Sequence, residues 1–458
     1  MNPTTTNAGM LPDDALAAFA GAVADAIAAR YPGAPAASVA FEAPRRPEFG
    51  DFATNVAFGL AKAARRAPAE IAASLAADIR EHAPQVAALF SGIDAVAGFI
   101  NLRCAPAVWQ TLIAVILRDG RNFGRFGPTG TRISLEFGSA NPTGPLVVVQ
   151  GRTLSLGDTL AKTLRFCGND VFVEWIINDH GNQLNTLGRS IFARYAQAFD
   201  SAFPFPEDGY PGEYLVPLAQ AIVRQDGKRW LDVSEATWLP YFAQFGRDAL
   251  VAEQQGTATR FGVAYDFWQS EHELHESGRV DDDLAKLGEM GLTYEKDGAL
   301  FFRTTSFGDD KDRVLRRSDG RPTYLAPDVT YHYEKFQRAD RVIDILGPDH
   351  HGYIERLKAI AAAMGYPGKL DVLTAQQITL MRGSEQVSMS KRSGNIVTLD
   401  DILDEVGVDA ARFFFVMLAA ESPLTFDLKL AVERTSENPV YYVQYSHARI
   451  ASVLKNAV

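Results

Sequence analysis

Length, composition and charge already exclude several classes of protein. The chain has 458 residues, 47% of them hydrophobic and 22% charged, which is enough for two or three domains with buried cores. A formal net charge of −11 argues against a general nucleic-acid binder, because such proteins neutralise phosphates with Lys and Arg, but a local basic face for one particular nucleic acid remains compatible with it.

The sequence shows no sign of export or membrane insertion. Its first residues lack the basic region and the apolar core of a secretory signal, and no run of about 18 apolar residues follows. The two cysteines are too few for a disulfide framework, which agrees with a reducing compartment. We therefore expect a cytoplasmic protein with no membrane partner.

Residues 1–115 are expected to form a small α+β domain. Ala-rich amphipathic stretches predict helices at 13–30 and 68–82, and residues 96–103 have the pattern of a strand. Five basic residues of this region are candidates for contact with a polyanion, although such residues are more often solvated. They are Arg45, Arg46, Lys62, Arg65 and Arg66.

Alternating strands and helices over residues 131–430 predict an α/β fold with a doubly wound parallel sheet. The expected strands are 132–137, 171–177 and 341–346. A helix is expected from Gln150 to Phe166, and the apolar segment 413–420 predicts a core helix. Residues 191 to about 291 are mostly helical in pattern, so we expect a helical insertion between the two halves of the sheet.

The segment from Ser139 to Arg152 connects the first of these strands to the helix that follows it. Turn residues at 141–145 separate the two elements. The first N–H groups of a helix are unpaired and its N-terminus carries a partial positive charge. Such a junction favours the binding of phosphate.

This segment also resembles one family. Residues 136–146 (Glu-Phe-Gly-Ser-Ala-Asn-Pro-Thr-Gly-Pro-Leu) are similar to the approach to the first class I signature of arginyl-tRNA synthetases, which continues His-Val-Gly-His-Gly-Arg. Further family motifs follow in the same order. They lie at 178–183, 308–313, 324–328, 349–352, 388–392 and 438–445. The resemblance implies a class I synthetase Rossmann-like fold, with Mg-ATP, L-arginine and tRNA as ligands.

The first signature departs from the family at three positions. The resemblance implies that two histidines contact the ATP phosphates and that the glycine between them lets adenine approach the backbone. Val147, Val149 and Gln150 stand there instead. Valine has no donor, and Gln150 has only a neutral one. Because one preorganised donor contributes about a hundred- to a thousandfold in rate, we expect adenylate formation to be severely weakened or absent.

The second signature is also altered. Ser388 takes the place of the first lysine of the family's Lys-Met-Ser-Lys loop, while Lys391 is kept. Lys391 and Gln150 are therefore the remaining catalytic candidates, and the resemblance implies that Asp349 and His350 lie near the nucleoside. We expect no metal site, since the few His and Cys lack ligand spacing of the zinc type.

The amino-acid side of the site matches the family. A guanidinium group pairs bidentately with carboxylates. By resemblance, Glu136 and Asn141 grip the α-amino and carboxyl groups, and Tyr324 and Asp328 cradle the guanidinium. From the residues alone, Asp328 fits equally well as the N-cap of a helix that begins at Val329.

Polar residues follow the strand predicted at 171–177. They are Asn178, His180, Asn182 and Gln183. Because ligands of open parallel sheets bind at the carboxyl ends of strands, we expect this cluster to face the same pocket, with Asn178 and Gln183 binding arginine. An ordinary polar turn is the alternative. The family commonly has alanine in place of His180.

Residues 431–458 resemble only the first helix of the family's anticodon-binding domain, so we expect a truncated domain without anticodon contact. The N-terminal domain resembles the one that approaches the tRNA elbow. Three functions remain open. The first is a degenerate member that binds L-arginine or a similar amino acid without efficient activation. The second is an enzyme that uses pre-activated arginine or arginyl-tRNA, and the third is a functional arginine–tRNA ligase.

Overall fold

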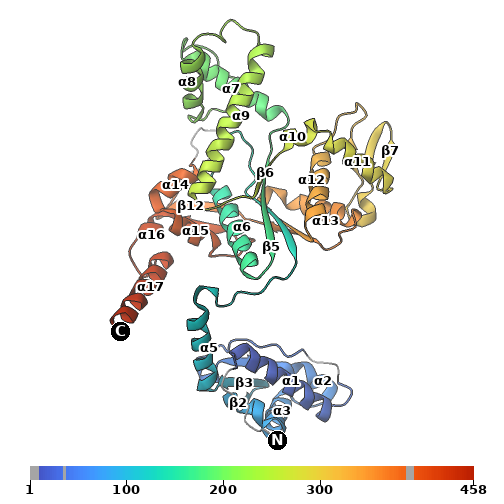
Figure 1. The fold of residues 1–458 in the computed structure, drawn as a ribbon, viewed down its shortest axis with the longest axis vertical. Coiled ribbons are helices and arrows are strands. Elements are labelled where there is room, and N and C mark those ends of the chain that lie inside the picture. Colours follow the sequence, from blue (N-terminus) through green and yellow to red (C-terminus); the bar gives the residue numbers. More distant parts are fainter. Residues whose placement is uncertain (1–9, 35–37, 388–396, 458) are drawn as a thin grey trace. The chain divides into compact units, whose positions relative to one another are not determined.

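The computed structural model describes residues 10–34, 38–387 and 397–457, which form two compact units, Met1–Arg125 and Phe126–Val458 (Figure 1). Each unit has its own hydrophobic core. Among the described residues, no helix is long and apolar enough to cross a membrane.

The first unit packs helices against a three-stranded antiparallel sheet of order β1-β3-β2. Its elements are α1 Pro12–Arg30, η1 Pro47–Phe49, β1 Phe52–Thr54, α2 Val56–Ala64, α3 Pro68–His82, α4 Pro84–Ala87, β2 Phe90–Val96, β3 Phe99–Cys104, α5 Pro106–Asp119 and η2 Gly120–Asn122. Proline opens α1 and α3, because its fixed φ suits the first helical turn. Phe19, Ile71 and Leu75 from these helices are fully buried in the core.

The strand predicted at 96–103 is wrong at its start, because the chain reverses there. Ala97 and Gly98 have φ of 51° and 91° and form the turn between β2 and β3. A Cβ at Gly98 would lie 2.8 Å from Phe58 Cζ, so the turn requires glycine. Ala-Gly is a weaker hairpin signal than Asn-Gly, which is why the pattern suggested one continuous strand.

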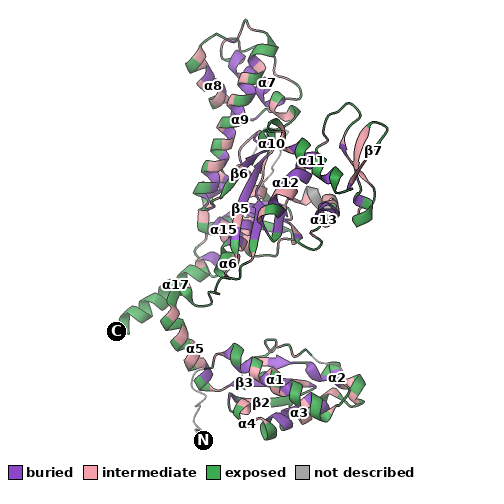
Figure 2. Ribbon diagram, turned by 45° about the vertical axis from the view of Figure 1, so that its right-hand side comes forward, coloured by how far each residue is buried: buried purple, intermediate pink, exposed green. Residues whose placement is uncertain are grey.

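The second unit is built on a parallel sheet of order β11-β10-β4-β5-β6. Its strands are β4 Arg132–Phe137, β5 Asp170–Ile177, β6 Phe267–Ser270, β10 Arg341–Leu346 and β11 Leu370–Thr374. Figure 2 shows the central strands as buried, with helices around them. Strands covered on both faces are mostly apolar, which explains why β4, β5 and β10 were recognisable in the sequence although each carries one buried carboxylate.

A helical cluster extends from this sheet. It consists of α7 Asn182–Gln197, α8 Leu215–Asp226 and α9 Glu235–Arg260, at the top of Figure 1. Its core is aromatic, with the rings of Phe192 and Trp238 stacked 3.8 Å apart. The helical insertion expected up to about 291 includes a strand of the sheet, because Phe267–Ser270 pairs with Glu174–Ile177. Four residues are too few to show a strand pattern beside a 26-residue helix.

The rest of the unit adds helices and two small sheets, of order β7-β8-β9 and β13-β12-β14. The helices are α6 Val148–Phe166, α10 Glu271–Glu276, α11 Arg279–Glu289, η3 Thr304–Phe307, α12 Leu325–Arg338, η4 Pro348–Tyr353, α13 Ile354–Ala363, α14 Leu399–Val406, α15 Val408–Val416, α16 Leu428–Val432 and α17 Pro439–Asn456. The small strands are β7 Thr293–Lys296, β8 Ala299–Phe302, β9 Arg313–Arg316, β12 Ile378–Arg382, β13 Glu385–Gln386 and β14 Leu424–Asp427.

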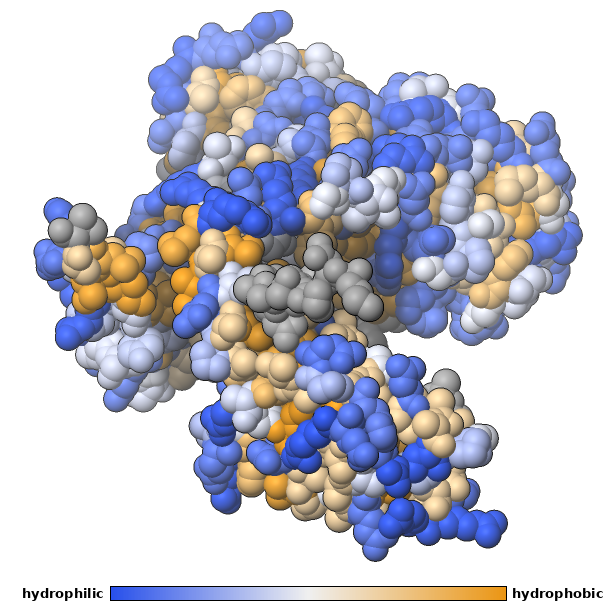
Figure 3. Space-filling view, turned by 60° about the horizontal axis from the view of Figure 1, so that its bottom comes forward, coloured by the Kyte–Doolittle hydropathy of each residue, from blue (hydrophilic) through white to orange (hydrophobic). Residues whose placement is uncertain are grey.

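Near the C-terminus, one helix differs from its predicted bounds and another exposes apolar side chains. The apolar helix predicted at 413–420 is α15, which begins earlier and ends at Val416. Apolar side chains are exposed along α17, among them Val443, Ile450 and Leu454. Figure 3 shows an apolar patch at its left edge, where α17 ends.

We predict that Gly157→Ala destabilises the second unit. Gly157 lies in α6, and an added Cβ would stand 2.0 Å from Phe137 Cγ in β4. Overpacking of this kind costs about 1–3 kcal/mol, which a urea unfolding curve measures. Gly256→Ala in α9 is the matched control, because no atom from another described part of the chain lies within 4 Å of its added Cβ. The control is expected to stabilise by about 0.5–1 kcal/mol, and equal midpoints for the two variants would contradict the packing argument.

Candidate functional site

A cavity of about 450 Å³ opens beyond the carboxyl ends of β4, β5 and β10. This is the edge at which open parallel sheets bind ligands. The cavity brings together residues from both sides of the predicted site. They are Glu136, Asn178, Tyr324 and Asp328 from the amino-acid side and Val149 and Gln150 from the first signature.

The first signature forms the N-terminus of α6. Val147 is the residue before the helix, with extended backbone. Its N–H donates to Gln150 Oε1 over 3.2 Å, so the amide carbonyl of Gln150 is used within the chain. Val149 is half-buried, packs against the core and lines the cavity. The turn therefore presents an aliphatic side chain, and one of its N–H groups is already paired.

The polar cluster after β5 divides between two places. Asn178 lines the cavity, and its Nδ2 donates to Asn141 Oδ1 over 3.3 Å. Gln183 Nε2 donates to the Asn178 carbonyl oxygen at 2.5 Å and so braces the turn. His180 lines a separate cavity of about 370 Å³ and stacks on His275 with the ring centres 4.0 Å apart. Asn182 opens α7.

Asp328 lies in the first turn of α12, and the N-cap of that helix is Tyr324. The interpretation of Asp328 as an N-cap is therefore wrong. Burial raises the pKa of Asp328, and the Tyr353 hydroxyl donates a hydrogen bond to its Oδ2, which favours the charged form. Tyr324 is 69% exposed, and its hydroxyl accepts from Arg356 Nη1 at 3.2 Å.

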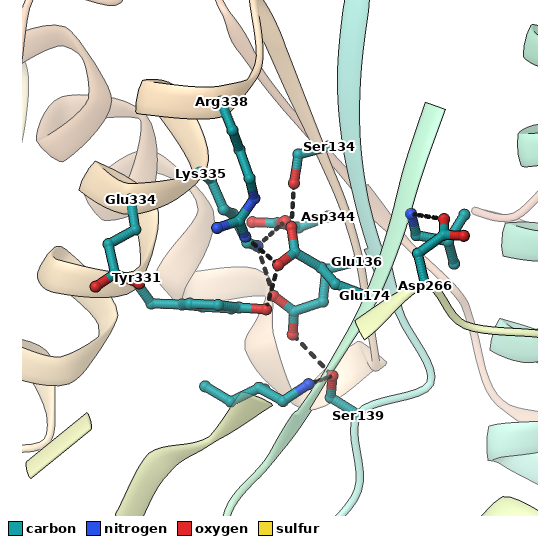
Figure 4. A network of polar contacts seen from close by, with 12 residues as sticks. Ser134, Glu136, Ser139, Glu174, Asp266, Tyr331, Glu334, Lys335, Arg338 and Asp344 are labelled. Atoms are coloured by element: carbon teal, nitrogen blue, oxygen red, sulfur yellow. Dashed lines mark hydrogen bonds and ion pairs between the residues drawn. The ribbon is translucent and has the colours of Figure 1, made fainter. Parts of the chain in front are cut away.

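A buried ionic network, shown in Figure 4, contributes Glu136 and Asp344 to the lining of the cavity. Lys335 of α12 is fully buried, and its Nζ donates to Glu136 Oε2 at 2.6 Å and to Asp344 Oδ1 at 2.8 Å. The strand register explains the meeting, because Asp344 pairs with Glu136, which pairs with Glu174 on the next strand. Three carboxylates thus stand in a row across β10, β4 and β5.

His332 completes this network. Its Nδ1 lies 2.7 Å from the Asp328 carbonyl oxygen and its Nε2 lies 2.8 Å from Asp344 Oδ2. Both neighbours are acceptors, an arrangement that favours the protonated ring, in which both nitrogens donate. Burial opposes the charge, but Asp344 outweighs it and raises the pKa of His332. At the far end of the row, Glu174 accepts from Tyr331 at 2.7 Å and pairs with Arg338.

Glu271 was not anticipated from the sequence. It follows β6 directly as the first residue of α10, at the carboxyl edge of the sheet. Burial, together with the charges of Asp328 and Asp179, raises the pKa of Glu271 to about 7. Because β6 was not recognised as a strand, the sequence offered no reason to place Glu271 beside Asp328.

Several predicted residues cannot be placed fully. Ser388 and Lys391 lie outside the described residues. Asp349 and His350 belong to η4, but their side chains are outside what the structure describes. In the described ranges, no group of three or more His, Cys, Asp or Glu could hold a metal ion.

Family models match both units. A model of the arginyl tRNA synthetase N terminal domain matches residues 17–104, and one of the tRNA synthetases class I (R) catalytic domain matches residues 248–422. Two arginine–tRNA ligases illustrate the similarity. That of Syntrophotalea carbinolica is 46% identical over 420 residues, or 91% of this chain and 75% of the relative, and that of Oceanobacillus iheyensis is 42% identical over 419 residues, with the same coverage.

Solved structures agree with this similarity. A putative arginyl-tRNA synthetase of Campylobacter jejuni superposes with a TM-score of 0.70 at 34% identity, covering 76% of each chain. The arginyl-tRNA synthetase of Thermus thermophilus, at 21% identity and a TM-score of 0.69, shares the fold over 96% of this chain and 82% of its own. The cavity thus lies in a class I Rossmann-like sheet, and the chain belongs to the arginyl-tRNA synthetase family.

Proposed function

We propose that this protein binds L-arginine in the cavity and that its activation of arginine with ATP is weak or absent. The observation that carries the proposal is the mixed lining of the cavity, where acidic residues suited to a guanidinium and an ammonium group meet Val149 and Gln150. The family uses Mg-ATP, and no imidazole stands at positions 147 to 150 to stabilise charge on the α-phosphate.

The carboxylates support the arginine part of the proposal. The charge of Asp328 raises the proton affinity of Glu271, as a neighbouring acid does. A bound guanidinium would relieve this repulsion and pair with both. Glu136, which lines the same cavity and accepts from Lys335, is the proposed acceptor for the α-amino group.

A functional arginine–tRNA ligase is the second candidate. Identities of 42–46% to curated ligases over 91% of the chain favour it. In this case, Gln150 Nε2 and Lys391 would replace the missing donors. The first unit, which matches the N-terminal domain of the family, would contact tRNA.

Arginine-dependent ATP–pyrophosphate exchange, run with and without tRNA, separates the two candidates. Our proposal expects no exchange above that of a Lys391→Ala control. Exchange well above this control would establish the ligase instead. Arginine binding is tested separately by thermal unfolding, since ligand at a hundred times its Kd stabilises by about 2.7 kcal/mol. No shift at saturating arginine would refute the retained pocket.

Arginine affinity is predicted to rise with pH between 6 and 8. The pKa of Glu271 is raised to about 7, so this carboxyl group is mostly protonated at pH 6 and mostly ionised at pH 8. The ionised form attracts a guanidinium, whose own charge does not change in this range. Calorimetric titrations should give a lower Kd at pH 8 than at pH 6 for the natural protein and a flatter profile for Glu271→Gln. Affinity that falls as the pH rises would contradict the assignment.

A further inference from the structure

The last turns of α9 hold the turn that precedes the first signature. Gln254 is 1% exposed, and its Nε2 donates to the carbonyl oxygens of Asn141, at 3.0 Å, and Gly144, at 2.9 Å. Both partners are acceptors, so only the NH₂ end of the amide can face them. Gln254 Oε1 is buried and has no partner among the described residues. The two bonds of Nε2 are therefore the hydrogen bonds that orient this side-chain amide.

A second residue of the helical cluster holds the same turn. The Tyr214 hydroxyl, at the start of α8, donates to the Thr143 carbonyl oxygen at 2.6 Å. A Cβ on Gly144 would lie 3.3 Å from that hydroxyl oxygen, so the turn and the ring are closely fitted. Carbonyl groups of Asn141, Thr143 and Gly144 are thus fixed by side chains from α8 and α9.

Different elements support Asn141 and Asp328. Asn141, which with Glu136 is predicted to grip the α-amino and carboxyl groups of arginine, accepts from the cavity residue Asn178 and belongs to the turn held by Gln254. Asp328, on the guanidinium side, is carried by α12 and receives its hydrogen bond from Tyr353. A change in α9 can therefore disturb one end without disturbing the other.

We propose that Gln254 and Tyr214 are positioning residues that shape the Asn141–Gly144 turn to grip the carboxylate of L-arginine, so that the helical cluster sets selectivity against decarboxylated analogues. This inference rests on the proposed arginine pocket. The same helix also reaches α14, where Thr257 and Arg260 both contact Asp400, Arg260 at 2.6 Å. The end of α9 is therefore anchored both to this turn and to α14.

The test compares L-arginine with agmatine, which keeps the guanidinium but lacks the carboxylate. Calorimetry on the full chain should give a Kd for L-arginine about tenfold higher in Gln254→Met, a factor that corresponds to about 1.4 kcal/mol. The Kd for agmatine should stay within about twofold, because its guanidinium group is expected to bind Asp328 of α12, which Gln254 does not contact. Gln255→Met, one residue along α9 at a half-buried position, is the control and should leave both values unchanged.

Each other outcome decides against the inference. An equal loss of affinity for L-arginine and agmatine would show that Gln254 supports only the fold. An unchanged Kd for L-arginine would show that the turn binds the carboxylate without the hydrogen bonds of Gln254. Tyr214→Phe removes a single hydroxyl and applies the same comparison if Gln254→Met fails to fold. If the natural protein binds L-arginine no better than agmatine, the carboxylate grip is absent. If it binds no arginine, the proposed function fails as well.

Discussion

The triple variant Val147→His, Val149→Gly and Gln150→His is expected to raise arginine-dependent ATP–pyrophosphate exchange by about two to three orders of magnitude. It restores charged or strong donors where phosphate charge develops, and one such donor contributes about a hundred- to a thousandfold. It also removes the Gln150 side chain that now accepts from the Val147 N–H. Gly at position 149 takes away the aliphatic side chain that lines the cavity.

The gain should disappear in the same triple variant carrying Lys391→Ala, which serves as its control. Val149→Gly alone tests the steric part and is expected to have a small effect, because it adds no donor. Exchange that stays at background in the triple variant would show that activation is lost for another reason, and would contradict the assignment of the defect to residues 147 to 150.

Asp328→Asn is expected to weaken L-arginine binding by about a hundredfold or more. Removing one partner of a buried charge pair costs about 3–5 kcal/mol, because the other charge stays behind without compensation. Calorimetric titration measures the loss. Asp319→Asn, an exposed aspartate that pairs with Arg321, is the control and should leave the Kd unchanged.

The same variant has a second expected signature. The charge of Asp328 helps to raise the pKa of Glu271, so its removal should move the pH dependence of binding to lower pH. Stability should change little or increase, since burial already disfavours the ionised form of Asp328. Retained tight binding with an unshifted pH profile would show that Asp328 does not face the ligand.

The sequence predicted those parts of the fold whose pattern is local. β4, β10 and α3 were expected within their observed bounds, because buried parallel strands are mostly apolar and a proline marks the start of the helix. The hairpin turn at Ala97 and Gly98 was not predicted, because residue type alone does not show that both residues have a positive φ.

The sequence named residues that line one cavity, but it did not predict how they are arranged. Family motifs pointed to Glu136, Asn178 and Asp328, which line one cavity. The contact of Glu136 with Lys335 depends on strand register and on the face that α12 turns to the sheet, which no motif specifies. Glu271 depended on recognising the four-residue β6.

The ammonium group of Lys335 donates to two of the three carboxylates in the row of Asp344, Glu136 and Glu174, so the charge at this edge of the cavity depends on it. Adjacent strands lie about 4.8 Å apart, so the three acids would repel one another strongly without the cations between them. A neutral residue in place of Lys335 would remove the ammonium group that now donates to both Glu136 and Asp344. Burial already raises the pKa of Glu136, so the loss of this cation would favour its protonated form further, and the binding of an α-amino group there would become coupled to proton release.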